Sequence, residues 1–367
     1  MDVIEFYDKD RPHFELSNYY PAAIYSYPTS EHYYQSMKYD YYGNTDVDDE
    51  YADQIAAQNT PNKARILAGQ LIKGGYKWQL ELNEIIRYYQ ELGIQIRTDW
   101  EDVKDNIMRR AVFLKFNVNP KLKQLLCNTG YSYLVEDSPR DSYWGVGKDK
   151  TGQNKLGQIL METRYILCGT YHTPAPSDRS NWVIPGHLLM AANPGRGLDD
   201  SGKKNNWKTD LATEYILSGV DTFISLQEEV PGNPYIPYQI TGTVNINGIT
   251  FRKYGKVWGY HLPIVDLGVT EDSSIIILAK TIIQLVAMNR RVMVHCAGGK
   301  GRAGTVISII LGMLYYLKPQ TAMTLAQFVF DTREYKGSHP HIPQTEVQRD
   351  QVTRILNKEE DVLKDIQ

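Results

Sequence analysis

A cysteine and an arginine six residues apart bracket a glycine-rich stretch in the second half of the chain. The stretch reads His295-Cys296-Ala297-Gly298-Gly299-Lys300-Gly301-Arg302. It lies between an apolar run predicted to be a strand and a longer one predicted to be a helix, so it should form a helix N-terminus, where anions bind favourably. The glycines let backbone N–H groups converge, and Arg302 can clamp phosphate oxygens. This field favours a Cys296 thiolate nucleophile for phosphoesters; an inert buried thiol beside a plain turn is the alternative.

This loop resembles the signature of the cysteine-dependent protein tyrosine and dual-specificity phosphatases, and the similarity extends over about residues 181–356. The resemblance implies that Cys296 attacks phosphorus to form a phosphocysteine and that Arg302 holds the phosphoryl oxygens. It places backbone phosphate binding on Ala297, Gly298, Gly299, Lys300 and Gly301. An aspartate on a preceding loop then protonates the leaving oxygen. The segment His261-Leu262-Pro263-Ile264-Val265-Asp266 resembles that loop, so Asp266 is the expected general acid and Asp272 its competitor.

One position departs from this family. The residue after the arginine is commonly Ser or Thr and helps to activate the thiolate, whereas this chain has Ala303, with Thr305 two places on. Phosphate binding survives that loss, but turnover would suffer, so a phosphate-recognising pseudophosphatase is the alternative to an active enzyme. Lys300 suits a polyanionic substrate such as a nucleotide or inositol phosphate, or is simply a solvated surface lysine.

The first half carries a different set of polar residues. The stretch from Pro28 to Lys38 begins with Thr29 and Ser30, which can cap a helix N-terminus. Glu31 and Lys38 lie about two helical turns apart and therefore share one face, with Gln35 between them. From spacing alone, a solvated charged stripe is the more common explanation of such a pair.

A second cluster lies further along, where Glu136, Asp141 and Trp144 are followed by glycines. At this point the chain resembles the YbiA-like, or NADAR, N-glycosidases. The matching stretches are Phe6-Tyr7, Leu16-Ser17-Asn18, Pro28 to Gln35, Lys38, Trp100, Met108 to Ala111, Lys115-Phe116, Leu134 to Glu136, Asp141, Tyr143 to Gly145, Asn154 to Gly157, Leu160 to Glu162 and Arg164. They follow one another over nearly all of residues 4–165.

The resemblance implies hydrolysis of the C1–N glycosidic bond of a phosphorylated ribose, in pyrimidine intermediates of riboflavin biosynthesis or in ADP-ribose attached to guanine. Because cleavage develops positive charge at C1, Glu31 and Asp141 are the expected stabilising carboxylates. Lys38 could form a Schiff base with the opened ribose if its pKa is lowered. Trp144 should stack on the base or ribose, and Asn18, Gly145 and Asn154 are the other expected substrate-binding residues. Residues 73–98 look longer than the family stretch, as a lid or partner surface would.

The elements that must position these residues change character along the chain. Helical periodicity before the prolines of residues 170–180 predicts a mainly helical α+β domain over 1–170, with helices at 30–39, 60–68, 103–116 and 154–164. After a linker at 171–180, strands at 222–226, 258–265 and 292–295 and helices at 275–288, 304–317 and 321–332 predict an α/β domain over 181–367. The phosphatase resemblance gives that domain a cysteine phosphatase fold.

Length, charge and cysteine count narrow the possible classes of protein. The chain has 367 residues, a net charge of −3 and three scattered cysteines. The charge disfavours a broad nucleic-acid or membrane surface, and the odd cysteine count predicts no disulfide framework and a reducing, cytoplasmic location. No cofactor and no metal ligand set are expected. The expected partners are small phosphorylated ribosyl or nucleotide substrates, with ADP-ribosylated nucleic acid or a phosphoprotein as larger alternatives and no membrane. The sequence therefore predicts a bifunctional hydrolase; an N-glycosidase carrying a phosphate-binding pseudophosphatase module is the alternative.

Overall fold

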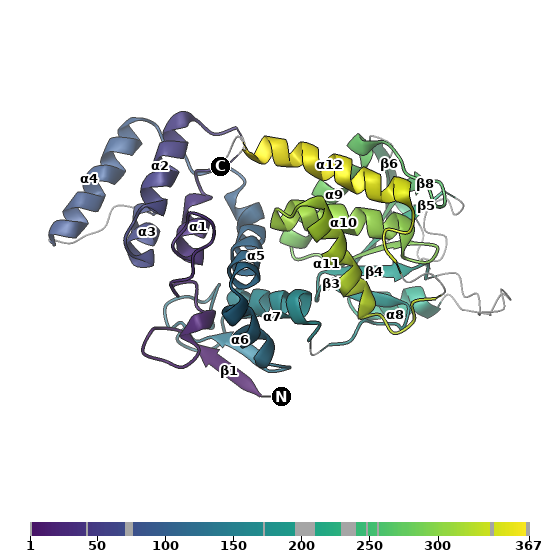
Figure 1. The fold of residues 1–367 in the computed structure, drawn as a ribbon, viewed down its shortest axis with the longest axis horizontal. Coiled ribbons are helices and arrows are strands. Elements are labelled where there is room, and N and C mark those ends of the chain that lie inside the picture. Colours follow the sequence, from purple (N-terminus) through teal and green to yellow (C-terminus); the bar gives the residue numbers. More distant parts are fainter. Residues whose placement is uncertain are drawn as a thin grey trace. The chain divides into compact units, whose positions relative to one another are not determined.

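The structure is a computed structural model that divides into two units, over residues 1–172 and 173–364. It describes residues 2–41, 43–69, 76–171, 173–194, 210–228, 240–246, 249–254, 257–337 and 341–364. In Figure 1 the first unit runs from purple to blue-green and the second from teal to yellow.

The first unit is mainly helical α+β, as predicted. Its two strands, β1 (Val3–Phe6) and β2 (Tyr133–Glu136), pair in parallel. The helices are η1 (Phe14–Leu16), α1 (Ser30–Ser36), α2 (Asp46–Ala56), α3 (Pro61–Leu67), α4 (Lys77–Glu91), α5 (Trp100–Val118), α6 (Pro120–Asn128) and α7 (Lys155–Cys168). Helices α1, α3, α5 and α7 coincide with the four predicted ones, although α1 ends at Ser36 instead of continuing through residue 39.

Helices α2 and α4 were not predicted, and they share one hydrophobic cluster with α3. Helix α2 begins with a capping box between Thr45 and Asp48, a signal present in the sequence. Helix α4 lies within the long stretch 73–98, of which residues 73–75 fall outside the described residues. Its buried Leu82, Ile86 and Tyr89 pack in the same cluster as residues of α2 and α3. The described part of this stretch is thus a packed helix of the first unit.

The second unit is built on a seven-stranded sheet in the order β3-β4-β9-β5-β8-β7-β6, which gives the predicted α/β class. Strands β4, β9, β5 and β8 are parallel, and β3, β7 and β6 are antiparallel to their neighbours. The bounds are β3 (Ser180–Ile184), β4 (Leu188–Ala192), β5 (Thr222–Gln227), β6 (Ile240–Ile246), β7 (Ile249–Tyr254), β8 (Val257–Ile264) and β9 (Val292–Cys296). The three predicted strands are β5, β8 and β9, which form the central parallel part.

The helices of this unit gather around α10, which contacts α9, α11 and α12 (Figure 1). Their bounds are α8 (Asp210–Leu217), α9 (Asp272–Ala287), α10 (Gly301–Tyr315), α11 (Pro319–Asp331) and α12 (Glu346–Lys364). Helices α9, α10 and α11 were predicted from their apolar periodicity. Because α10 is covered by its neighbours, nearly all of its side chains are buried, as expected for a helix that is apolar on every face.

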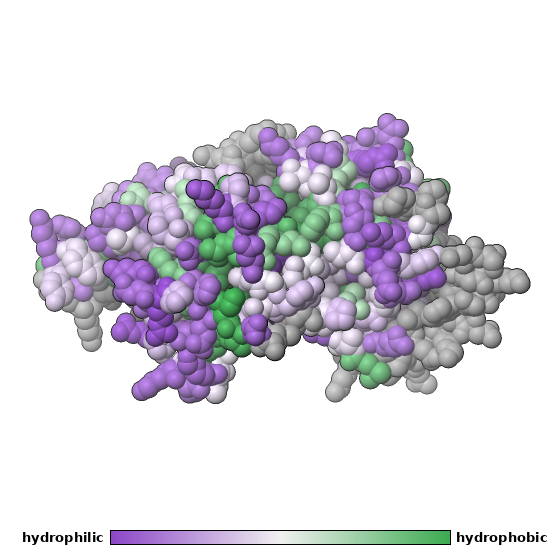
Figure 2. Space-filling model, turned by 60° about the horizontal axis from the view of Figure 1, so that its bottom comes forward, coloured by the Kyte–Doolittle hydropathy of each residue, from purple (hydrophilic) through white to green (hydrophobic). Residues whose placement is uncertain are grey.

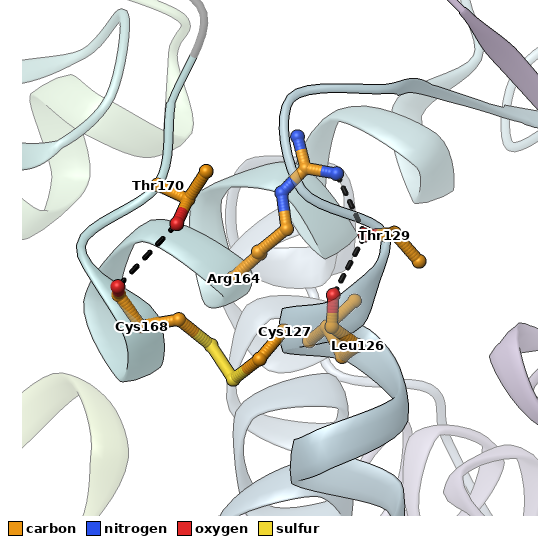
Figure 3. Close-up of a disulfide and its surroundings, with 6 residues drawn as sticks. All are labelled: Leu126, Cys127, Thr129, Arg164, Cys168 and Thr170. Carbon is orange, nitrogen blue, oxygen red and sulfur yellow. Dashed lines mark hydrogen bonds between the residues drawn. A yellow bond between two sulfur atoms is a disulfide. The ribbon is translucent and has the colours of Figure 1, made fainter.

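Cys127 and Cys168 form a disulfide, which corrects the expectation that the cysteines are unpaired. Their Cα atoms lie 5.7 Å apart although 41 positions separate them in sequence. Helices α6 and α7 pack together and bring these ends into contact (Figure 3). Nearby, Arg164 donates to the hydroxyl of Thr129. An odd cysteine count does not show that two helices end side by side, and the bond removes one basis for predicting a reducing compartment. Cys296 is free and buried.

The boundary between the units falls after residue 172, inside the predicted linker of 171–180. The indole N–H of Trp182 in β3 donates to the carbonyls of Thr173 and Pro174. These contacts tie the last part of the predicted linker to the second unit.

The outer surface is chemically mixed. Figure 2 shows hydrophilic and hydrophobic residues interspersed on one side of the molecule. Among the described residues, none of the helices combines the length and apolar character needed to cross a membrane.

Candidate active sites

Helix α1 positions the first pair of predicted residues. The hydroxyl of Thr29 accepts a hydrogen bond from the backbone N–H of His32 and caps the helix, so Glu31 lies in its first turn. The Glu31 side chain is buried, and its Oε1 accepts a 2.8 Å hydrogen bond from Nε2 of Gln35. Its backbone N–H donates to the carbonyl of Asn18. The predicted carboxylate is therefore held inside the protein and is not part of a solvated stripe.

Lys38 follows the end of α1 and still interacts electrostatically with Glu31. Its Nζ donates to the carbonyl of Ala68 at 3.4 Å and lies 5.6 Å from the ring centre of Trp100. Burial lowers the pKa of Lys38, with a further contribution from Arg65, and this outweighs the opposing effect of Glu31. A lysine that forms a Schiff base needs a lowered pKa, and the pKa of Lys38 is shifted in that direction.

Three carboxyl groups interact in this site. Burial raises the pKa of Glu31. Burial also raises the pKa of Glu136, at the end of β2, to about 8, and the charges of Asp141 and Glu31 add to that effect. Among the described residues, Oε2 of Glu136 has no hydrogen-bond partner. Asp141 differs from the other two because its Oδ1 accepts 2.8 Å hydrogen bonds from the backbone N–H groups of Tyr143 and Trp144.

Aromatic rings line the same region. The ring of Tyr34 lies 5.5 Å from that of Trp144, edge to face, and 5.0 Å from that of Trp100, measured between ring centres. The Tyr143 hydroxyl donates to Asp105 of α5 at 2.6 Å and holds the Trp144 segment in place. Trp144 is half-buried, so part of its surface can still meet a ligand. This arrangement is compatible with stacking of a base or ribose.

The other residues predicted to bind substrate divide into two groups. Asn18 is buried, and among the described residues its Oδ1 has no hydrogen-bond partner, which leaves it able to bind a donor. Asn154 uses its whole amide on β2, donating to the carbonyl of Leu134 and accepting from the N–H of Glu136. A Cβ atom at Gly145 would lie 2.7 Å from the carbonyl oxygen of Glu136. Asn154 and Gly145 therefore contact the backbone of the strand that ends at Glu136, and their binding of substrate stays a prediction.

Sequence reasoning assigned no role to three residues of this site: Glu136, Arg65 and Tyr19. Arg65 of α3 is exposed and interacts electrostatically with Glu31 and Lys38. It also hydrogen-bonds with Tyr19. Glu136 stood in the quoted motif, but α3 carries no local signal that would assign Arg65 to the site.

The second site is the turn between β9 and α10. Strand β9 ends at Cys296, which is 3% exposed, and α10 begins at Gly301. Gly299 has φ +63°, and a Cβ atom there would lie 2.3 Å from the carbonyl oxygen of Ala191 in β4. Only glycine fits this conformation and this contact. At Gly301 a Cβ atom would lie 2.9 Å from the side-chain amide of Gln348.

Arg302 is 2% exposed and faces the segment predicted to be the acid loop. Its Nη1 donates to the carbonyl of Ile264 at 2.9 Å, and its Nη2 lies 2.8 Å from Oδ1 of Asp266. Asp272, the competing acid, is instead the first residue of α9, where Arg354 holds its pKa below the usual range. The structure therefore brings Asp266, and not Asp272, to the arginine of the loop.

Other groups of the loop interact with residues outside it. The carbonyl of Ala297 accepts from the N–H of Asn193, and that of Gly298 accepts from Nη1 of Arg333 at 3.2 Å. Lys300 is half-buried, and burial followed by the charge of Arg333 lowers its pKa, while Cys296 has the opposite effect. This interaction with Cys296 favours the substrate-facing role predicted for Lys300 over a solvated surface role.

The position of Thr305 bears on the missing hydroxyl at Ala303. The Thr305 hydroxyl donates to the carbonyl of Gly301 within α10, at 3.0 Å. This bond uses its single donor on the helix backbone. Burial, followed by the charges of His261 and Arg302, lowers the pKa of His295 to about 3, so the residue before Cys296 is a neutral imidazole. Among the described residues, no group of three or more His, Cys, Asp or Glu side chains is placed to hold a metal ion.

Two protein families match the chain, one for each unit. Residues 5–168 match the NADAR domain, and residues 177–351 match the Swiss Army Knife protein, DSP-PTPase phosphatase domain. The chain is 33% identical over 186 residues to the maize chloroplastic riboflavin biosynthesis protein PYRR, a match that spans 48% of this chain and 27% of the maize protein. It is 30% identical over 169 residues to the N-glycosidase YbiA of Escherichia coli K12, a match that spans 45% of this chain and 88% of YbiA.

Among solved structures, that of Tk-PTP in its active form matches 49% of this chain and 97% of its own, with 17% identity and a TM-score of 0.35. At the family level, the chain thus joins an N-glycosidase-like domain to a phosphatase-like domain, an architecture that supports a bifunctional hydrolase. It belongs to the NADAR family of YbiA-like proteins over residues 5–168 and carries a Swiss Army Knife DSP-PTPase phosphatase domain over residues 177–351.

Proposed function

We propose that the first unit hydrolyses the C1–N glycosidic bond of a phosphorylated ribosyl compound and that the second unit dephosphorylates a phosphoester through a phosphocysteine. The observation that supports the proposal most is that each unit gathers its predicted groups. Glu31, Lys38 and Asp141 interact in the first. In the second, Arg302 follows Cys296 in one loop and contacts Asp266. The substrates proposed for the first unit are pyrimidine intermediates of riboflavin biosynthesis or ADP-ribosylated guanine, and a cytoplasmic location is part of the proposal.

For the first unit, cleavage leaves positive charge at C1, which the carboxylates of Glu31 and Asp141 would stabilise. Lys38, once deprotonated, could attack C1 as the ribose opens, so that a C–N bond to lysine replaces the bond to the base and an amine proton passes to solvent as the Schiff base forms. Because burial raises the pKa of Glu136 to about 8, this carboxyl carries a proton at neutral pH and could donate it to the departing base nitrogen. Water then hydrolyses the Schiff base and frees Lys38.

For the second unit, the sulfur of Cys296 would attack phosphorus as the bond to the leaving oxygen breaks, and water would later cleave the P–S bond. Asp266 would protonate the leaving oxygen. Its ion pair with Arg302 must open first, because Arg302 is needed by the phosphoryl oxygens. Since the Asp266 side chain is 66% exposed, it is free to turn toward a bound substrate.

Ala303 favours one alternative, in which the second unit binds phosphate without turnover and recruits a phosphorylated partner, an ADP-ribosylated nucleic acid or a phosphoprotein, to the N-glycosidase. The loop and Arg302 would suffice for that binding. In the active form, by contrast, the two units could act in sequence, one releasing a ribose phosphate or ADP-ribose and the other removing a phosphate from it.

The test uses the full chain. Wild type, Glu31→Gln and Cys296→Ser are each incubated with a ribosylated pyrimidine intermediate, an ADP-ribosylated guanosine and an aryl phosphate, and products are identified by mass spectrometry. We expect Glu31→Gln to lose only base release and Cys296→Ser to lose only phosphate release. Aryl phosphate turnover that persists in Cys296→Ser would refute the phosphocysteine. Wild type that binds phosphate without turnover would favour the pseudophosphatase.

A further inference from the structure

Arg333 is a buried cation that no motif of the sequence singled out. It lies two residues beyond α11, and its side chain is 3% exposed. A guanidinium stays charged when it is buried, so it needs several hydrogen-bond acceptors around it. The acceptors found here come from three separate segments of the second unit, one of which is the loop that contains Cys296.

The guanidinium of Arg333 donates hydrogen bonds to acceptors in β3, in β4 and in the loop. Nε and Nη2 both donate to Oδ1 of Asn181 in β3, at 3.1 and 2.9 Å. Nη2 also donates to the carbonyl of Met190 in β4, at 3.0 Å. Nη1 donates to the carbonyl of Gly298, at 3.2 Å. One planar group thus fixes the loop against the two strands beside it.

This contact sets the direction of the loop amides. The carbonyls of Ala297 and Gly298 are both bound by groups outside the loop, namely the N–H of Asn193 and Arg333. The C=O and N–H of one planar trans peptide point in opposite directions. Because the two carbonyls point toward Asn193 and Arg333, the N–H groups of Gly298 and Gly299 point the other way. These two N–H groups are therefore available to an anion.

The charge of Arg333 also reaches the loop. It is one of the groups that act electrostatically on Lys300, which in turn interacts with Cys296. The loop therefore receives positive charge from a residue outside its own sequence, in a chain that has Ala303 where the related phosphatases commonly have a hydroxyl.

We propose that Arg333 is a positioning residue that holds the phosphate loop in its anion-binding form and adds positive charge beside it. The proposal rests on the proposed phosphate site of the second unit and deepens it. Arg333 does not touch the reacting atoms; it acts through the carbonyl of Gly298 and through its charge.

The experiment compares Arg333→Met, Arg333→Lys and the control Arg290→Met in the full chain. Arg290 binds Asp221 and Thr222 at the start of β5, the opposite end of the sheet from Cys296. The rate of Cys296 alkylation by iodoacetamide is followed by mass spectrometry against pH, without and with inorganic phosphate. Melting temperature is measured in parallel.

We expect Arg333→Met to raise the phosphate concentration for half-protection about tenfold, the size expected for a lost charge-assisted contact. Arg333→Lys should keep part of the phosphate protection, because the charge remains, and lose part of it, because lysine lacks the planar fork. Arg290→Met should leave the protection unchanged.

An Arg333→Met protein with a lower melting temperature but unchanged phosphate protection would overturn the proposal and leave a purely structural role. If Arg333→Met does not fold, Asn181→Leu removes the acceptor and keeps the charge, and unchanged protection in that variant would also overturn it. Wild type that phosphate does not protect would instead refute the proposed phosphate site itself, whatever the variants do.

Discussion

The candidate site of the first unit consists of side chains, whereas much of the candidate site of the second unit consists of backbone. In the first unit, the chemical groups are buried side chains that act on one another: Glu31 and Asp141 both raise the pKa of Glu136, and Glu31 opposes the lowering of the pKa of Lys38. In the second unit, much of the site is backbone. Gly299 must be glycine, and the acid Asp266 is largely exposed and linked to the loop through Arg302.

This difference predicts how substitutions propagate. Where buried charges interact at short range in a medium that screens them weakly, removing one charge changes the protonation of its neighbours. Where the site is a backbone loop with an exposed acid, a side-chain change should remain local. Substitutions in both units can test that contrast, from the largest expected effect to the smallest.

The largest effect is expected for Glu31→Gln. We expect base release to fall by about 10²–10³-fold, because the neutral amide no longer stabilises charge at C1. The loss should propagate, because the pKa of Glu136 falls once the negative charge of Glu31 is gone. Base release is measured against pH with whichever ribosyl substrate wild type cleaves. Glu81→Gln, on the exposed side of α4, is the matched control.

Base release by Glu31→Gln within about twofold of wild type would remove Glu31 from the mechanism. An unchanged pH profile alongside a large loss of rate would show that the carboxyl groups do not interact as described.

Asp266→Asn should lower turnover of an alkyl phosphate by about 10²-fold, the usual contribution of a general acid. An aryl phosphate with a good leaving group should lose much less, because its oxygen needs no proton. The change should remain local, leaving the pH dependence of Cys296 alkylation as in wild type. Asp272→Asn is the matched control; it removes the pair with Arg354 and should affect stability without affecting the leaving-group dependence. Equal losses in the two variants would contradict the choice of Asp266.

The sequence was most informative where a site is contiguous. The Cys296–Arg302 loop, the strand before it and the helix after it follow one another along the chain, so the spacing of glycines and apolar residues predicted all three. The same holds for the cap at Thr29, which begins the helix that carries Glu31, although spacing alone did not predict that Glu31 is buried. The class of both units and the helices α1, α3, α5 and α7 of the first were also predicted, because their periodic apolar faces are local features.

Features assembled from distant segments were not predicted. Arg65 and Tyr19 reach Glu31 from separate parts of the first unit, and Arg333 meets Gly298 across 35 positions. The pairing of Cys127 with Cys168 requires knowing that α6 and α7 end together. Asn154 was expected to bind substrate because a family motif contains it, whereas its amide is used by the backbone of β2. A motif identifies such a residue but does not show which way its side chain points.

Glu136→Gln should change stability in a pH-dependent way. The folded protein raises the pKa of Glu136 from 4.5 to about 8, so this carboxyl binds its proton more tightly when folded. Its contribution to stability is fully present below pH 4.5 and is lost as pH rises through 8. Relative to wild type, Glu136→Gln should therefore gain on the order of a few kcal/mol of unfolding free energy at pH above 8 and little at acid pH.

The measurement for Glu136→Gln is urea unfolding of both proteins across this pH range. A constant difference between them at every pH would show that Glu136 titrates normally and is not protonated at neutral pH.

The smallest effect is expected for Thr305→Val, because the Thr305 hydroxyl already donates to the carbonyl of Gly301. Within a helix such a bond contributes little to stability, so phosphate protection and aryl phosphate turnover should stay within about twofold of wild type. Ala303→Ser, which places a hydroxyl directly after Arg302, should instead raise turnover. A large loss in Thr305→Val would show that Thr305 supplies the hydroxyl missing at Ala303. In that case this site, like that of the first unit, would depend on a buried side chain and the contrast between the two units would be weaker.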